Sequence, residues 1–467
     1  MSGRYDAAVI GGGIDGLTAV ALLAKAGLRA VLLEGSPSLT GNDTSPALRA
    51  LDPRVVKELK LARHGLKFAA RDLELAILRP GGQPVAIMRD RHAAARSLAS
   101  LSPTDATAFA SYRAEMYTLA RALRLTWWEG RPMAETVALL KPAQKNLLDR
   151  LKVTSASAYL SSWFESDPLK AALAFDAAAC GFSPSEPGSA LALLWSASQE
   201  MCGLQGAVAI PRGGADGLVQ ALSQAAKAAG AELRTSATVS RLTVAAGAVS
   251  GVELAAGERI DAPLVLSALC GRRTLQALAP TALIGFGAAQ ALGRSSAEIG
   301  NVTLVLGLNR RPDFGGNRIV IAERLEIYET ALAEARLGRM PREPALELIA
   351  PPPEGPAEQL ASRILLCVRV WPVPLGEGFD PGALARSVPA MIERHVPGFA
   401  VASCDVAQPR AAAPSVERLL CGADQRIETP IRGLLLCGGD AEPTDALSGR
   451  AARQAARRAV SLHRERP

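Results

Sequence analysis

Three glycines near the start of the chain have the spacing of a phosphate-binding turn. Gly11, Gly13 and Gly16 form the pattern G-x-G-x-x-G between the apolar run 7–10 and the Ala- and Leu-rich run 17–26. In such a turn the first glycine lets the chain leave a strand tightly, the second lets backbone approach a pyrophosphate, and the third lets a helix pack close to the sheet. The N–H groups that begin the helix attract phosphates. The pattern predicts a dinucleotide site, with a plain structural turn as the alternative.

A single acidic residue ends the next apolar run. Glu34 follows the run 28–33, at the distance from Gly16 at which an acidic side chain can bind ribose hydroxyls. The order strand, turn, helix, strand predicts a βαβ unit. The motif leaves NAD and FAD open, although its place so near the start of the chain favours FAD. The candidate cofactor-binding residues of this unit are Gly11, Gly12, Gly13, Asp15, Gly16, Glu34 and Gly35.

The far end of the chain offers elements of the same kind. The apolar run 434–437 predicts a buried strand, Gly438 and Gly439 a tight exit, and Ser448 the cap of a helix that runs to about position 463. The run 264–269 is too apolar for the edge of a sheet, so we expect it to pair with the first sheet. Elements so far apart in sequence predict one nucleotide-binding domain built from distant pieces.

The predicted fold class is therefore α/β with two domains. A Rossmann-like FAD-binding domain is expected from the discontinuous segments 1–84, 205–285 and 425–467. A mixed α+β substrate-binding domain is expected over 85–204 and 286–424. The first of these two segments is dominated by helical patterns, so it forms a helical insert.

Composition narrows the classes of function. The 467-residue chain has a net charge of +7 and only 4% aromatic residues, without basic and aromatic residues interleaved, so we expect no nucleic-acid partner. The seven cysteines form no C-x-x-C pair, which predicts reduced thiols in the cytoplasm and excludes flavoproteins with a closely spaced redox cysteine pair. Four widely separated histidines indicate no metal site. We expect neither a membrane span nor a signal peptide, and a weak attraction to anionic lipid stays open.

Longer segments resemble a family of flavoproteins. The resemblance is to the phytoene desaturase-like FAD-dependent oxidoreductases, and within them to the branch named after pyridine nucleotide-disulfide oxidoreductase domain-containing protein 2. It covers nearly the whole chain. It is carried by GGGIDGL near the start, LDPRVVKELKLARHGLKF at 51–68, SSWFESDPLKAALAF at 161–175, PRGGADGLVQAL at 211–222 and the closing GLLLCGGDAEPTDALSG.

The resemblance implies non-covalent FAD and hydride transfer to or from the flavin. The three glycines would face the pyrophosphate, Glu34 the adenine-side ribose, and the backbone of Val239 the adenine. The C-terminal motif would lie against the flavin, where a helix N-terminus stabilises the negative charge of the reduced ring. For Asp440, the alternatives are a bond to the cofactor and a role in its own turn. The resemblance adds the cofactor-binding candidates Asn42, Val239, Gly439, Asp440, Leu447 and Ser448. It indicates no catalytic acid–base pair.

The chain departs from the family pattern at two places. Where the family has a second Gly-Gly pair, this chain has Gly41 and Asn42, and asparagine tolerates left-handed backbone. Where the family has a glycine-rich run beside the flavin, this chain has Thr444, Asp445 and Ala446. The charge of Asp445 would oppose the anionic form of the reduced flavin.

Two functions of different classes are therefore weighed. The first is an FAD-dependent oxidoreductase that desaturates, saturates or isomerises a hydrophobic, polyene- or isoprenoid-like substrate, as the family and the apolar helical insert imply. The second is a degenerate flavoprotein that binds FAD weakly or not at all and serves as the structural partner of an active homologue. Association with itself or with a homologous subunit, and peripheral contact with a membrane, stay open.

Two further groups of side chains have competing interpretations. The tryptophans of the helical segment either line a substrate tunnel or belong to the core; they are Trp127, Trp128, Trp163 and Trp195. The arginines of the last helix are expected on a solvated face rather than against a partner; they are Arg450, Arg453, Arg457 and Arg458.

Overall fold

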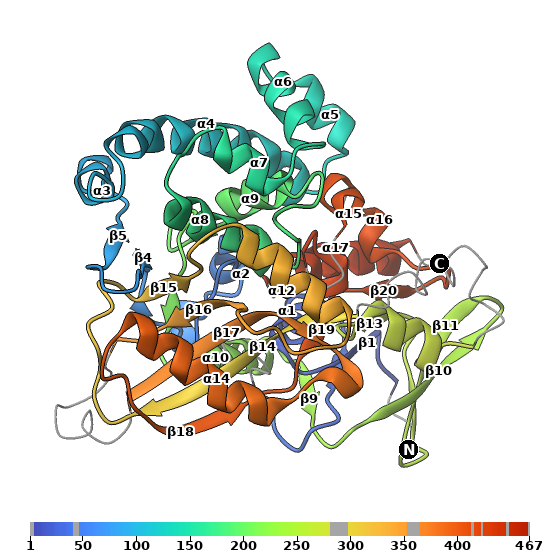
Figure 1. Cartoon of the computed structure of the whole chain (residues 1–467). Helices are drawn as coiled ribbons and strands as arrows, with labels where there is room; N and C mark the ends of the chain where they lie inside the picture. The colour runs from blue at the N-terminus through green and yellow to red at the C-terminus, as the bar shows by residue number, and fades with distance from the viewer. Residues whose placement is uncertain are drawn as a thin grey trace.

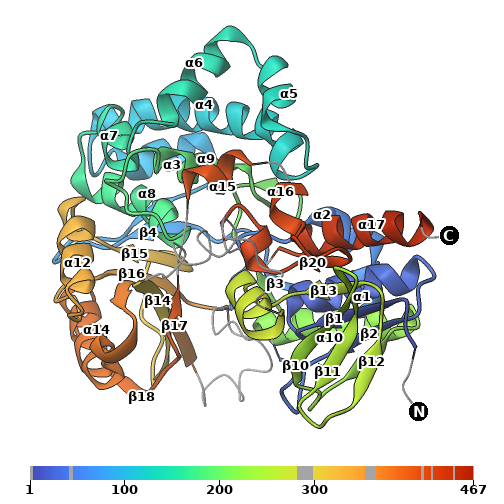
Figure 2. The same cartoon turned by 90° about the vertical axis from the view of Figure 1, so that its right-hand side faces the viewer.

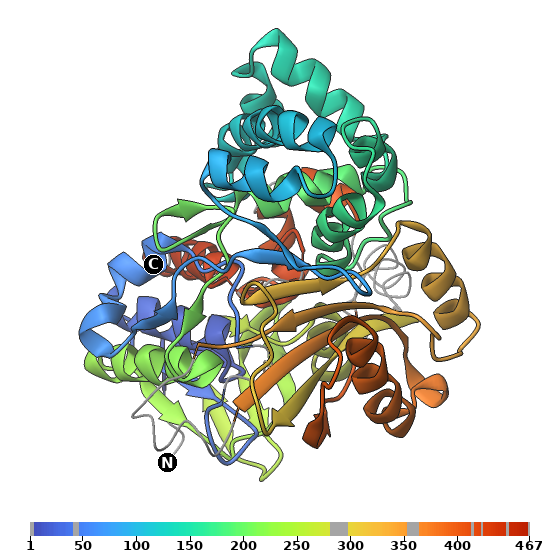
Figure 3. The same ribbon diagram turned by 60° about the vertical axis from the view of Figure 1, so that its left-hand side comes forward.

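The computed structural model describes residues 4–40, 46–280, 298–352, 364–411, 415–421, 424–444 and 448–465. Figure 1 shows a small parallel sheet with its helices, a larger sheet and a group of helices. In Figures 2 and 3 the helical group lies above both sheets, which stand side by side beneath it. Within the described ranges, no helix is both long enough and apolar enough to cross a membrane.

The small sheet brings together distant stretches of the chain. Its order is β20-β13-β1-β2-β9, and every neighbouring pair is parallel. The strands are β1 (Ala7–Ile10), β2 (Ala30–Leu33), β9 (Glu232–Arg234), β13 (Val265–Ser267) and β20 (Leu434–Leu436). The predicted pairing of the run 264–269 with the first sheet is confirmed, because β13 lies directly beside β1.

Apolar residues on both faces account for the buried position of this sheet. Ala7, Val9 and Leu32 pack on helices, whereas Ala8 and Val31 pack on a small antiparallel sheet. The helices are α1 (Ile14–Lys25), α10 (Gly214–Ala228) and α17 (Arg450–Arg464). The antiparallel strands are β10 (Val239–Ala245), β11 (Ala248–Leu254) and β12 (Arg259–Asp261). A parallel sheet covered on both faces confirms the α/β, Rossmann-like class.

The larger sheet has the order β18-β14-β17-β16-β15-β4-β5, with β19 beside β14. Its strands are β4 (Leu75–Ile77), β5 (Val85–Ile87), β14 (Ile299–Leu308), β15 (Arg318–Ile321), β16 (Ala345–Ile349), β17 (Ile364–Pro374), β18 (Val401–Val406) and β19 (Arg410–Ala411). On the outer face, Leu304, Leu348 and Val368 share a core with α14 (Pro381–His395). The opposite face carries charged residues and is described below.

One strand of the larger sheet differs from the expected domain division. β4 falls inside the segment 1–84 assigned to the FAD-binding domain, but it pairs with β15. The sequence of a three-residue apolar strand does not indicate which sheet the strand will join, so β4 could not be assigned to a domain from the sequence. The other domain boundaries stay a prediction.

The helical group has an aromatic core. Its helices are α3 (Arg91–Leu98), α4 (Pro103–Trp127), α5 (Met133–Ala138), α6 (Pro142–Leu151), α7 (Ala156–Ser161), α8 (Asp167–Ala179) and α9 (Ala190–Ser198), joined by α12 (Glu326–Arg336). The ring of Trp127 meets that of Trp195 edge-on at 5.3 Å, and both side chains are buried. Trp127 is thus a core residue, whereas Trp195 also lines a cavity.

Short elements connect these parts. They are α2 (Pro53–Glu58), α15 (Val416–Leu420), α16 (Asp424–Ile427), β3 (Phe68–Ala70), β6 (Glu200–Met201), β7 (Leu204–Gln205) and β8 (Ile210–Pro211). β3 pairs with β8, which ties the segment after the first βαβ unit to the start of α10.

Candidate functional site

A cavity of about 480 Å³ lies at the carboxyl ends of β1 and β2. Open α/β sheets bind their ligands at this edge. We call it the glycine-loop cavity. Its lining includes most of the candidates from the βαβ unit and one from β10: Gly11, Gly12, Gly13, Asp15, Glu34, Gly35 and Val239. Gly16 lies behind them in the first turn of α1.

Two glycines of the turn differ in their surroundings, Gly16 in a close contact and Gly13 beside open space. A Cβ atom on Gly16 would lie 1.8 Å from the carbonyl oxygen of Gly11, so no side chain fits there. A Cβ atom on Gly13 would meet no described atom within 4 Å, and the φ of −76° suits any residue. The protein therefore leaves the space before Gly13 open, at the N-terminus of α1, where a pyrophosphate is expected.

Glu34 stays ionised at the edge of the glycine-loop cavity. Its carboxylate accepts hydrogen bonds from the N–H groups of Gly12 at 2.6 Å and Ser36 at 2.8 Å. Burial by itself would raise the pKa of Glu34, but these backbone donors outweigh burial and lower that pKa. An anionic acceptor at this position can bind ribose hydroxyls. The open space at Gly13 and the charge of Glu34 together fit a dinucleotide.

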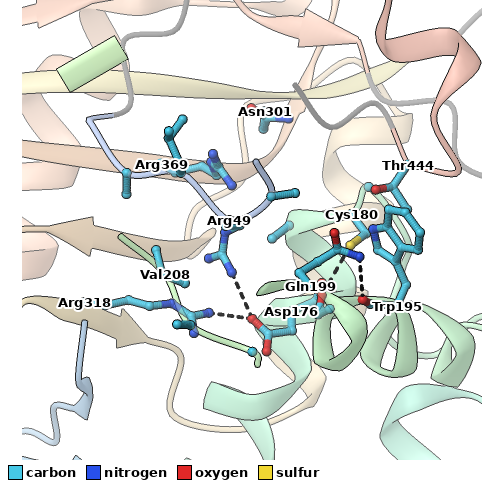
Figure 4. A pocket seen from close by; sticks show the side chains of 18 of the residues that line it. Arg49, Asp176, Cys180, Trp195, Gln199, Val208, Asn301, Arg318, Arg369 and Thr444 are labelled. Carbon is cyan, nitrogen blue, oxygen red and sulfur yellow. Dashed lines mark hydrogen bonds and ion pairs between the residues drawn. The ribbon is translucent and has the colours of Figure 1, made fainter. Parts of the chain in front are cut away.

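A second cavity, of about 180 Å³, lies between the larger sheet and helices α8 and α9 (Figure 4). We call it the arginine cavity, because four arginines line it: Arg49, Arg318, Arg369 and Arg410. Arg410 lines both cavities, so the two adjoin. Thr444, which belongs to the C-terminal motif, lines the arginine cavity as well.

Two carboxylates and three of these arginines form one ionic network. Arg49 contacts Glu347 and lies 3.1 Å from Asp176. Arg318 lies 2.5 Å from Asp176 and 2.7 Å from Glu347. Arg369 lies 3.7 Å from Glu347. Burial tends to raise the pKa of Glu347, but the three guanidinium groups outweigh it and hold that pKa at about 2. Glu347 is therefore ionised at neutral pH.

The residues of the arginine cavity were not predicted from the sequence. Its sheet residues are single charged residues inside apolar strands: Arg318 in RIVI, Glu347 in ALELI and Arg369 in ILLCVRVWPVP. Charged residues are rarely buried unless they are paired or functional. A lone charge in an otherwise apolar strand is the pattern that could have revealed them.

One buried hydrogen bond attaches the C-terminal segment to α1, and another lies within the segment itself. Ser448 donates a hydrogen bond to Glu442 at 2.5 Å, and Asp15 accepts one from the N–H of Gly449 at 2.9 Å. The predicted cap of the last helix is corrected by one residue. The N-cap of α17 is Gly449, whose φ of 69° turns the chain into the helix, although Ser448 still accepts from the N–H of Arg450.

The solvated face expected for the last helix is wrong for two of its arginines. Arg450 is 1% exposed and Arg453 is 7% exposed. Arg450 lies 3.4 Å from Glu442, and its guanidinium stacks over the ring of Trp195 at 5.2 Å. The helix packs on α1 and beside the helical group, so its N-terminal arginines face the interior. There, a carboxylate and an aromatic ring stabilise the guanidinium of Arg450.

The remaining C-terminal candidates are held by contacts inside the protein. Asp440 accepts a hydrogen bond from the N–H of Gly271 at 2.5 Å, and the carbonyl of Gly439 accepts one from Arg418 at 3.2 Å. Gly439, Asp440 and Ser448 are not among the described residues that line either cavity. Asn42 and Leu447, and the changed positions Asp445 and Ala446, lie outside the described residues.

Asp15 makes stability depend on pH. Burial and the nearby charge of Glu442 raise its pKa from 3.8 to about 8. The folded state therefore holds a proton that the unfolded state releases above pH 4, so this group destabilises the fold progressively as pH rises to about 8.

The Asp15→Asn variant removes that titration and keeps an oxygen for the N–H of Gly449. We expect its unfolding free energy, relative to wild type, to increase by up to about 1.4 kcal/mol per pH unit between pH 4 and 8. Urea unfolding at several pH values measures this difference. A constant difference across this range would contradict the assignment.

Neither a thiol nor a metal suggests another chemistry at these cavities. Burial raises the pKa of the Cys180 thiol, which lines the arginine cavity, to about 11, so it stays protonated at neutral pH. Among the residues that the structure describes, no cluster of three or more histidine, cysteine or acidic side chains could hold a metal ion.

Two family models match the chain. The model for flavin-containing amine oxidoreductases matches residues 56–304, and the model for NAD(P)-binding Rossmann-like domains matches residues 9–60. The second match covers the glycine turn and Glu34. A flavin family and a dinucleotide-binding unit in one chain agree on FAD as the cofactor, as the sequence predicts.

Individual relatives agree with the resemblance found in the sequence. The chain is 26% identical to pyridine nucleotide-disulfide oxidoreductase domain-containing protein 2 of Rattus norvegicus, over 97% of this chain and 93% of that protein. It is 26% identical to one of the subunits of limonene dehydrogenase from Castellaniella defragrans, over 56% of this chain and 50% of that protein. An oxidoreductase from Methanosarcina mazei shares the fold with a TM-score of 0.62 at 16% identity, over 99% of this chain and 100% of that one.

Proposed function

The chain belongs to the family of flavin-containing amine oxidoreductases, and we propose from this premise that it transfers hydride between FAD and a hydrophobic organic substrate. The observation that carries the proposal is the open space before Gly13, at a helix N-terminus and beside the ionised Glu34. A chain that no longer bound a dinucleotide would have no need to keep that space open.

The two adjoining cavities would hold different parts of the cofactor and the substrate. The N–H groups of α1 and the carboxylate of Glu34 would hold the adenosine and pyrophosphate parts in the glycine-loop cavity. The arginine cavity, reached by Thr444 and Arg410, would receive the flavin end and the substrate. FAD supplies the two-electron chemistry, in which a hydride leaves or reaches a substrate carbon. Trp195 and Val208 contribute apolar surface that excludes water from this space.

Desaturation, saturation and isomerisation of a polyene- or isoprenoid-like substrate are the reactions that we propose. The similarity to limonene dehydrogenase supports a hydrophobic substrate, since limonene is a hydrocarbon. That relative is named as one part of a larger enzyme, which supports association with a homologous chain as a second proposal. A degenerate partner protein is the competing function, motivated by Thr444, Asp445 and Ala446 in place of the family's glycine-rich run.

The visible absorption spectrum of the purified protein tests the proposed function first. We expect a flavin spectrum near one FAD per chain that bleaches reversibly on anaerobic titration with dithionite. A protein that stays colourless after incubation with excess FAD would reject the enzyme and favour the degenerate partner.

A further inference from the structure

We propose that the arginine cavity binds an oxyanion, a carboxylate or a phosphate, on an otherwise apolar substrate, and that Arg369 is the residue that holds it. The inference rests on the proposed function, because it names the substrate class of the same site. It also changes the expected substrate from a neutral hydrocarbon to an amphipathic molecule with an anionic head group.

The charge balance of the cavity leaves one guanidinium without a full partner. Arg49 and Arg318 each contact both Asp176 and Glu347, so two carboxylates neutralise two arginines. Among the described residues, Arg369 has an ion pair only with the shared Glu347, at 3.7 Å. Its buried Nε–H donates to no atom of the described chain. The network of these five residues therefore carries a net charge of +1.

The position of Arg369 on β17 places this unbalanced positive charge on the wall of the cavity. On β17, residues 367, 369 and 371 share the face opposite the α14 core, and Cys367 and Trp371 are both buried there. Figure 4 shows Arg369 beside Asn301 on the sheet side of the cavity, while Arg49 and Arg318 point at Asp176. The Arg369 side chain is 18% exposed, and a partly buried cation is costly unless an anion faces it. Guanidinium edges bind carboxylate and phosphate oxygens in pairs.

Part of the remaining lining suits an apolar body. Leu48, Trp195, Val208 and several alanines offer apolar surface, beside polar side chains that include Gln199, Asn301 and Thr444. A protonated amine would be repelled by the positive net charge of the five-residue ionic network. The lining therefore selects an anionic amphiphile over a cationic one, although the family is named after amines.

Six-carbon probes that differ only in head group test this selection. Isothermal calorimetry on the FAD-loaded protein would use hexanoate, hexyl phosphate, hexanol and hexylammonium. We expect binding of at least one of the two anions, and at least about tenfold weaker binding of hexanol and hexylammonium. Whichever anion binds more tightly identifies the head group. Tighter binding of hexylammonium, or binding of no anion, would overturn the proposal.

Variants of Arg369 test the residue. Arg369→Gln leaves Arg49 and Arg318 balanced by two carboxylates, so we expect it to fold and to bind the anion at least about tenfold more weakly. Arg369→Lys keeps the charge but loses the paired geometry, and an intermediate loss is expected. Arg394→Gln, which changes an exposed ion pair, is the matched control and should bind like wild type.

FAD content separates this proposal from the proposed function. If Arg369→Gln loses FAD, and wild type binds the anion only when FAD is bound, then Arg369 serves the cofactor and the proposal is wrong. If wild type holds no FAD, the proposed function fails, and the same calorimetry on the FAD-free protein still decides for or against the anion site.

Discussion

Replacing Gly13 by alanine should weaken FAD binding while leaving the fold unchanged. The added Cβ meets no described atom within 4 Å, and the backbone has an ordinary φ of −76°. A methyl group would nevertheless occupy the space in which the pyrophosphate approaches the backbone. Forcing an extra methyl into a packed contact costs about 1–3 kcal/mol, so we expect about tenfold to hundredfold weaker FAD binding, measured by flavin fluorescence on titration of the FAD-free protein.

Gly16→Ala is the contrasting variant. Its Cβ would lie 1.8 Å from the backbone oxygen of Gly11, so α1 must move away from β1. Here the thermal stability of the FAD-free protein should fall together with FAD binding. Equal loss of stability in both variants would mean that Gly13 serves the fold and not the ligand. Unchanged FAD affinity in Gly13→Ala would remove the pyrophosphate from this turn.

The sequence was most informative where local chemistry determines structure. The glycine turn, the strand that ends on Glu34 and the distant strands β13 and β20 were predictable, because turn geometry and continuous apolar runs determine them. Val239 was placed at the same cavity only through the resemblance to a family. Local sequence patterns and the family resemblance therefore identify the same cavity, at the carboxyl edge of the small sheet.

The arginine cavity was not predictable, because its members come from elements far apart in the chain. Arg49, Asp176, Arg318, Glu347 and Arg369 lie on a loop, a helix and three strands. A lone charge in an apolar strand marks three of them as unusual, but only the sheet register shows that they meet, since it places Glu347 opposite Arg369 on neighbouring strands. Register depends on tertiary pairing, which a single sequence leaves open. The same reason explains Arg450 and Arg453, whose burial follows from the packing of α17 on α1.

Glu347→Gln should cause a large loss of stability, measured as the free energy of unfolding. Glu347 is 2% exposed, and its carboxylate faces Arg49, Arg318 and Arg369. Removing one partner of a buried ionic network leaves charges uncompensated, which costs about 3–5 kcal/mol. Urea unfolding at pH 7 measures this loss. Glu343→Gln, in an exposed pair with Arg394, is the control and should change stability by less than about 0.5 kcal/mol.

The pH dependence of that loss identifies its cause. The pKa of Glu347 is lowered from 4.5 to about 2, because the three arginines outweigh the burial that would raise it. A lowered pKa stabilises the fold fully above pH 4.5, and this stabilisation disappears as pH falls through 2. The difference between wild type and Glu347→Gln should therefore shrink by up to about 3 kcal/mol between pH 5 and 2. A difference that stays constant over this range would mean that packing around the side chain, and not its charge, stabilises the sheet face that forms the arginine cavity.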